Sequence, residues 1–110
     1  MAKIKNLTPH DVTLIISDDR SVTFPTYSGV TPIPRVSARI VSDGNIDGYP
    51  LTRTEYGEVE DLPEPEEDTW YIVSAMVAGR CPDRSDLVIP NEAVRDDKGR
   101  IVGCRSLGRV

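Results

Sequence analysis

Apolar and polar residues alternate with a period of two through much of the first quarter of the chain. Val12, Leu14 and Ile16 recur at every second position, with Thr13 and Ser17 among the residues between them. This pattern is typical of a half-buried β-strand. Proline and short polar runs on either side indicate turns. The sequence therefore predicts strands at Lys3–Leu7, Val12–Ser17 and Ser21–Phe24, joined through Thr8-Pro9 and Asp18-Asp19-Arg20.

A second region of alternation begins at Arg35, after a stretch from Pro25 to Pro34 whose prolines and glycine predict an irregular loop. Val36, Ala38 and Ile40 fall on one face, and a partner strand is expected from about Tyr49 to Tyr56. Asp47-Gly48 lies between the two, and a two-residue turn of this type needs positive φ angles, which glycine tolerates. We therefore expect a β-hairpin here.

The most apolar segment lies in the second half of the chain, at Trp70–Val73, and predicts a central strand. Ser74 is placed to cap a short helix through about Arg80, which Pro82 ends. A final hairpin is expected from Leu87–Ile89 through Pro90-Asn91 to Val94–Asp96, then through Lys98-Gly99 to Ile101–Cys104. The expected fold class is α+β, a mainly antiparallel β domain with one short helix.

Length and hydropathy indicate one domain spanning residues 1–110. No apolar run is long enough to span a bilayer, and the opening residues lack an apolar signal-peptide stretch. We expect a soluble, cytoplasmic protein without a membrane partner. Cys81 and Cys104 form no CxxC pair, so we interpret both as free thiols and small core residues.

The net charge of −5 is distributed unevenly. Eight acidic residues and no basic ones lie between Glu55 and Asp68, which leaves ten acids and thirteen bases, a net of +3, in the rest of the chain. The segment GEVEDLPEPEED is interpreted as an extended, solvated excursion, since it lacks the spacing of a calcium loop. No dense basic face is present for duplex nucleic acid, but a small anion needs only two or three arginines.

Candidate catalytic chemistry is restricted by the single histidine, His10. No nucleophile motif accompanies it, and one histidine with scattered carboxylates lacks the spacing of a metal site. We therefore expect no cofactor and no metal. His10 could hydrogen-bond its neighbours in a turn, contact a ligand, or act as an acid or base.

Arginine is the side chain best suited to bind phosphate, because its planar guanidinium pairs two oxygens at once. Surface solvation, or an ion pair such as Arg84 with Asp86, is the alternative for these residues. The sequence therefore predicts a pocket for a phosphate-bearing nucleotide, lined by His10, Arg53, Tyr56, Arg80, Arg84 and Arg105.

Several motifs resemble a family of small proteins from bacteriophages and prophages, and the likeness covers nearly the whole chain apart from residues 17–34. They are Asn6-Leu7-Thr8-Pro9-His10-x-Val12, the stretch from Arg53-Thr54-x-Tyr56-Gly57 to Pro65, Tyr71-Ile72-Val73-Ser74, Pro82-Asp83-Arg84-x-Asp86, and the run from Val94-Arg95-Asp96 to Leu107. The resemblance implies a short, soluble phage protein acting in the bacterial cytoplasm. Proteins of that size and origin include sponges that sequester nucleotide signals of host immunity.

Three functions follow from these observations. The first is a binding protein that captures a small phosphorylated ligand and counters nucleotide-signalled host defence. The second is a structural or protein-interaction module of a phage, and the third is a nucleotide-degrading enzyme that uses His10. We also expect a homo-oligomer, most simply a dimer, because exposed sheet edges favour pairing of two copies.

Overall fold

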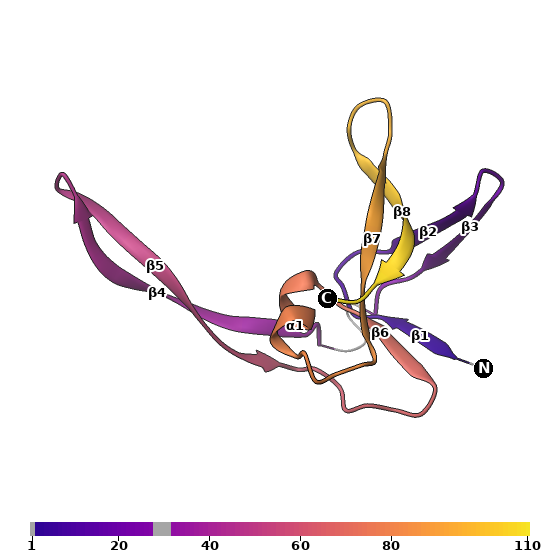
Figure 1. The fold of residues 1–110 in the computed structure, drawn as a ribbon, viewed down its shortest axis with the longest axis horizontal. Helices are drawn as coiled ribbons and strands as arrows, with labels where there is room; N and C mark the ends of the chain where they lie inside the picture. Colours follow the sequence, from indigo (N-terminus) through magenta and orange to yellow (C-terminus); the bar gives the residue numbers. More distant parts are fainter. Residues whose placement is uncertain (1, 28–31) are drawn as a thin grey trace.

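The computed structural model describes residues 2–27 and 32–110, and these form a β-rich fold with one short helix (Figure 1). The β-rich character expected from the sequence is confirmed. Of the expected irregular loop, residues 28–31 lie outside the described part of the chain. The elements are β1 (Lys3–Asn6), β2 (Val12–Ser17), β3 (Arg20–Phe24), β4 (Arg35–Ile46), β5 (Tyr49–Glu60), β6 (Thr69–Ile72), α1 (Ala75–Arg80), β7 (Leu87–Arg95) and β8 (Ile101–Gly108).

Six strands form one mixed sheet in the order β1-β6-β7-β8-β2-β3. The neighbours β1, β6 and β7 run parallel, whereas β7–β8 and β2–β3 are antiparallel hairpins. A single parallel pair, Leu14 with Cys104, joins β2 to β8. The sequence predicted mainly antiparallel pairing. The parallel β6–β7 pair arises because α1 returns the chain from β6 to β7 in the same direction, as a crossover connection does.

The core lies on both faces of β6. Tyr71 and Val73 pack on one side with Leu7, Leu87 and Val77 of α1. Their neighbour Ile72 packs on the opposite side with Val12, Val88 and Cys104. A strand that is covered on both faces has no polar face to show, so its sequence is a continuous apolar run.

Helix α1 begins as predicted. The Ser74 side chain accepts a hydrogen bond from the Val77 amide at 3.3 Å, which satisfies one of the free donors of the first turn. Val77 and Ala78 are buried against the sheet, and the helix ends at Arg80. The short length of α1 places the Arg80 side chain at the edge of the core.

The hairpin of β4 and β5 forms a separate two-stranded sheet, which we call the arm (Arg35–Glu60). Asp47 and Gly48 have φ angles of 50° and 85°, so the predicted turn is confirmed, and β5 continues four residues past the expected end. The arm extends away from the six-stranded sheet (Figure 1). The Cα radius of gyration is consequently 17.2 Å, against about 13 Å for a compact domain of this length.

The last hairpin is longer than the sequence suggested. Strand β7 continues through Pro90-Asn91 without a turn, and Glu92 adopts a φ of 58° within it. Gly99 has a φ of 80° and its amide bonds to the carbonyl of Asp96, which confirms a turn in the Lys98-Gly99 region. In the described parts of the chain, no helix is long and apolar enough to cross a membrane.

The acidic segment is partly structured and is attached to the core. Its first residues belong to β5, and Val59 and Leu62 pack against the core cluster around Tyr71. The Tyr71 hydroxyl donates to the Glu64 carbonyl at 3.2 Å. The carboxylates themselves are largely exposed. The segment 57–68, which we call the strap, is therefore solvated on its outer side and attached to the core through Val59, Leu62 and Glu64.

Both cysteines are free thiols, as expected from their spacing. Cys104 is buried in the core, with its sulfur 3.5 Å from the Thr13 carbonyl oxygen. Cys81 is only half-buried at the end of α1 and packs at the margin of the core. The expectation of two core thiols therefore holds fully for Cys104 alone.

Candidate functional site

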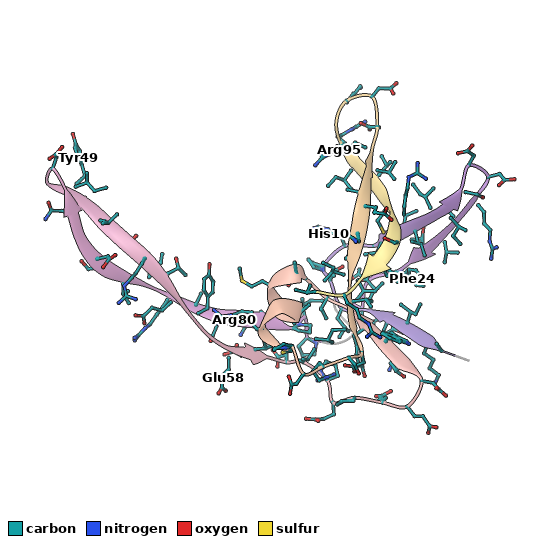
Figure 2. The ribbon with its side chains drawn as sticks, in the orientation of Figure 1. His10, Phe24, Tyr49, Glu58, Arg80 and Arg95 are labelled. Atoms are coloured by element: carbon teal, nitrogen blue, oxygen red, sulfur yellow. The ribbon has the colours of Figure 1, made fainter. Side chains whose placement is uncertain are left out.

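Two of the six predicted ligand residues, Tyr56 and Arg80, contact each other where the arm packs against α1. The guanidinium carbon of Arg80 lies 5.2 Å from the centre of the Tyr56 ring. Figure 2 labels Arg80 beside α1. The Tyr56 side chain is exposed on β5, and Arg80 is exposed at the last position of the helix. A guanidinium at this distance from an aromatic ring is attracted by the ring quadrupole. The Ser74 cap and the burial of Val77 fix the end of α1, and thereby the position of Arg80.

A shallow recess of about 360 Å³ lies beside this contact and is lined by Ser37, Ala38, Arg39, Glu55, Tyr56 and Gly57. Its floor depends on the absence of a side chain at Gly57, because a Cβ atom there would collide with the Ser37 hydroxyl. That hydroxyl donates to the Glu58 carbonyl at 3.3 Å. The guanidinium of Arg39 and the Ser37 hydroxyl therefore line the same recess as the exposed Tyr56 ring.

The charged side chains of the arm are paired with one another. Arg39 donates twice to Glu55, at 3.1 and 2.9 Å. Arg53 lies 2.9 Å from the other oxygen of Glu55 and 3.7 Å from Asp43. All of these groups are substantially exposed, so each pair contributes little to stability. Arg53, a predicted ligand residue, is thus held in a surface network of alternating charge.

Arg84 has a structural partner in this fold. Its guanidinium forms a two-pronged ion pair with Asp86, with both N···O distances at 2.9 Å, and donates to the Pro63 carbonyl at 3.0 Å. The hydrogen bond from Arg84 holds the pKa of Asp86 below its usual value, although burial acts in the opposite direction. The same bond raises the pKa of Arg84. The ion-pair alternative considered for Arg84 is therefore present.

The remaining predicted residues lie on other elements. His10 is exposed in the loop between β1 and β2, and its carbonyl accepts hydrogen bonds from Asn6 and Thr8 at 2.8 and 2.9 Å. Arg105 is exposed on β8. Within the described part of one chain, Tyr56 and Arg80 are the two predicted ligand residues that contact each other. One copy of the chain does not gather the six residues into a single pocket.

Asn6 organises the Asn-Leu-Thr-Pro-His motif and was missed as a key residue by sequence reasoning. Its side chain is buried, with 1% of the residue exposed. The amide donates to the carbonyls of His10 and Phe24, both at 2.8 Å, and its oxygen accepts from the amide and hydroxyl of Thr8. An Asx-type turn signal was available in the sequence, but the Phe24 contact was not. The motif therefore builds the β1–β2 turn.

Two further features were not anticipated. Arg109 lies over Trp70 with its guanidinium carbon 5.3 Å from the ring centre. A second recess of about 290 Å³ opens between β2 and the β7–β8 hairpin, and its walls include Val12, Ile101, Val102 and Cys104. It contains no arginine.

The described residues contain no assembled set of metal ligands. No group of three or more His, Cys, Asp or Glu side chains there is placed to hold a metal ion. The sequence matches no protein-family model and no curated protein, and the fold matches no solved structure. The geometry at Tyr56 and Arg80 is therefore the basis for assigning a function.

Proposed function

We propose that this protein binds and sequesters a small phosphorylated ligand of the nucleotide class at Tyr56 and Arg80. The observation that carries the proposal is the exposed guanidinium above an exposed tyrosine ring, beside an open recess. A base can stack on an aromatic face, and arginine can pair with two phosphate oxygens. The two groups at this site match the two chemical halves of a nucleotide.

The surrounding residues would supply the remaining contacts. Arg39 lines the same recess, and its guanidinium has donors for phosphate or ribose oxygens beyond the two that it gives to Glu55. The Ser37 hydroxyl donates to the Glu58 carbonyl and would act toward a ligand as an acceptor. Arg53 lies next to the recess and is ion-paired with Glu55, one of its lining residues. Arg105 and His10 lie elsewhere in one chain and would join such a site only in a homo-oligomer. Arg84 is already bonded to Asp86 and Pro63, so its proposed contribution is to hold the strap that follows the arm.

The phage context is part of the proposal. A short phage protein that acts in the bacterial cytoplasm and binds a nucleotide without converting it would act as a sponge for a signal of host antiviral defence. The recorded hydrogen bonds of His10 are made by its carbonyl oxygen. They give no support to the alternative in which His10 degrades the ligand.

A protein-interaction module is the second candidate, and the arm favours it. Ile40, Ile46 and Tyr49 are 74%, 59% and 72% exposed along this projecting hairpin. Exposed apolar side chains on a protruding element are typical of interaction surfaces. This module would need no ligand.

A thermal-shift screen with cyclic dinucleotides, cyclic ADP-ribose-type compounds and mononucleotides tests the ligand proposal, because a ligand that binds only the folded state raises Tm. Arg80→Ala should weaken the affinity for the nucleotide about 10- to 150-fold in calorimetric titration, as expected for loss of a hydrogen bond to a charged group. Tyr56→Ala should also weaken it. Arg100→Ala and Tyr49→Ala, which change the same residue types far from the recess, should not.

The chemical state of the ligand separates the alternatives. Ligand released by heat should have an unchanged mass, because the proposal includes no bond cleavage. A cleaved product would replace sequestration by an enzymatic function. If none of the nucleotides shifts Tm, the interaction module becomes the better account.

A further inference from the structure

The outer edge of β5 is open along its whole length. Among the described residues, the backbone of Tyr49–Glu60 is hydrogen-bonded to β4 and to no other element. Open edges present unpaired donors and acceptors, which proteins normally cover or disrupt. A two-stranded ribbon is also marginally stable in water by itself. The arm thus lacks the third and fourth strands that would stabilise it.

The part of this edge that can accept another strand is short and well defined. Pro50 has no amide proton, so pairing is weakened at the distal end. At the other end the β4–β5 register shifts between the pairs Ala38–Tyr56 and Val36–Val59, which leaves Gly57 and Glu58 out of the regular ladder. The usable edge therefore runs from Thr52 to Tyr56. Its midpoint is Thr54.

The sequence of this edge, Thr-Arg-Thr-Glu-Tyr, is complementary to itself in the antiparallel direction. When two copies pair about Thr54, Arg53 lies opposite the partner's Glu55, and Thr52 lies opposite the partner's Tyr56. Opposite charges facing across strands stabilise a sheet, whereas like charges destabilise it. Centring the pairing on Arg53 or on Glu55 would place two like charges face to face.

We propose that two copies of this chain associate by antiparallel pairing of their β5 edges about a two-fold axis at Thr54. The pairing converts two ribbons into one four-stranded sheet. It also extends the existing contacts of Glu55 with Arg39 and Arg53 into a ladder of alternating charge across both arms. The interface uses the same surface on each copy, as closed two-fold dimers do.

The outer edge of β4 is less suitable for this role. Its register shifts between Ser42 and Asn45, and Gly44 has a φ of 96° within that shift. Bulges of this kind bend a strand and block edge pairing. The inference does not depend on the proposed ligand, because it follows from the edge itself.

Sedimentation velocity between about 1 and 100 µM, the range suited to a small interface, measures the association. Wild type should shift from the 12.1 kDa monomer to twice that mass. Arg53→Glu places two acids opposite each other and should raise the dimer dissociation constant at least about tenfold. Arg100→Glu, the same change at an exposed site on the opposite hairpin, should leave it unaltered.

A charge-reversed arm carrying Arg39→Glu, Asp43→Arg, Arg53→Glu and Glu55→Arg keeps the pairs of Glu55 with Arg39 and Arg53, and of Arg53 with Asp43, with their charges exchanged. This variant should dimerise with itself as wild type does, but should not form mixed dimers with wild type. Free mixing of the two would overturn the proposal. So would a wild-type protein that stays monomeric throughout this range, or an equal loss in Arg53→Glu and Arg100→Glu.

Disulfide trapping tests the register without changing any charge. Residues opposite each other in an antiparallel pair have Cα atoms about 4.5–5.5 Å apart, within disulfide range. Thr54→Cys should therefore cross-link two copies under mild oxidation. Thr52→Cys should not, because position 52 lies about 14 Å from its counterpart along the paired strands. Equal cross-linking at both positions, or none at Thr54→Cys, would contradict the two-fold axis.

Discussion

At the scale of single residues, the amide of Asn6 makes the densest set of side-chain hydrogen bonds in the described structure. It connects the end of β1 to the following turn and to the end of β3 through Phe24. Every polar atom of this buried side chain is satisfied, so its contribution is structural. Asn6 therefore has a structural role, although it lies in the same motif as the candidate ligand residue His10.

Asn6→Ala should lower the free energy of unfolding by at least about 2 kcal/mol, because it removes the hydrogen bonds that the Asn6 side chain makes to the Phe24 carbonyl and to the Thr8 amide. Urea denaturation monitored by Trp70 fluorescence measures this loss. Asn45→Ala is the matched control, since Asn45 is exposed and accepts one hydrogen bond from Gly48 at 3.2 Å. Equal losses in the two variants would show that the Asn6 bonds add nothing.

At the scale of elements, the Arg84–Asp86 ion pair ties the acidic strap to the start of β7. Both side chains are largely buried, with 18% and 16% of their surface exposed. The bond from Arg84 to the Pro63 carbonyl crosses to the strap, and Tyr71 makes a parallel bond to Glu64. Two hydrogen bonds from the core thus hold a segment whose own sequence predicts no regular structure.

The stability of the protein should fall in acid through this pair. Because the folded-state pKa of Asp86 is lowered, its contribution is present above the unfolded pKa of about 3.9 and is lost as pH falls through the folded value. Asp86→Asn should cost about 1.5–3 kcal/mol at pH 7, as for a hydrogen bond to a charged group. Urea titrations should show a smaller difference in the free energy of unfolding between wild type and variant at pH 3 than at pH 7. A gap that is independent of pH would contradict the assignment.

At the scale of the whole molecule, the chain divides its residues between a small mixed sheet and a projecting arm. The principal extents of 56 × 39 × 26 Å reflect this arrangement. The buried residues belong to the sheet, α1 and the segments between them, whereas the arm contributes mainly partly buried positions near its base. A projecting two-stranded ribbon is only marginally stable in an isolated monomer, so this shape favours association through the arm.

Local stability should differ accordingly. In dilute solution, amide hydrogens of the arm should exchange much faster than those of Tyr71–Val73, because ribbon hydrogen bonds open without disrupting the core. Hydrogen exchange followed by mass spectrometry of peptides from the two regions measures this difference. Protection of the arm equal to that of β6 in the dilute monomer would contradict it.

Local features were largely determined by the sequence itself. The predicted apolar face of β2 is only partly buried, since Val12 is buried but Ile16 is 49% exposed. Strand β2 itself, the turn at Asp47-Gly48, the apolar run of β6 and the Ser74 cap were all predicted and are present. Each depends on residues within a few positions of one another, where backbone preference and side-chain periodicity act directly. The turn at Lys98-Gly99 belongs to the same class.

The tertiary structure alone decided the parallel half of the sheet, the placement of β6 between β1 and β7, and the projection of the arm. It also separated the predicted ligand residues, bringing Arg80 to Tyr56 and Arg84 to Asp86. The Arg84 guanidinium was a sound phosphate candidate by its chemistry, but its buried charge needed a partner in the fold. Such outcomes depend on contacts between residues far apart in the chain, and those are set by packing and desolvation of the whole molecule, which local sequence patterns do not specify.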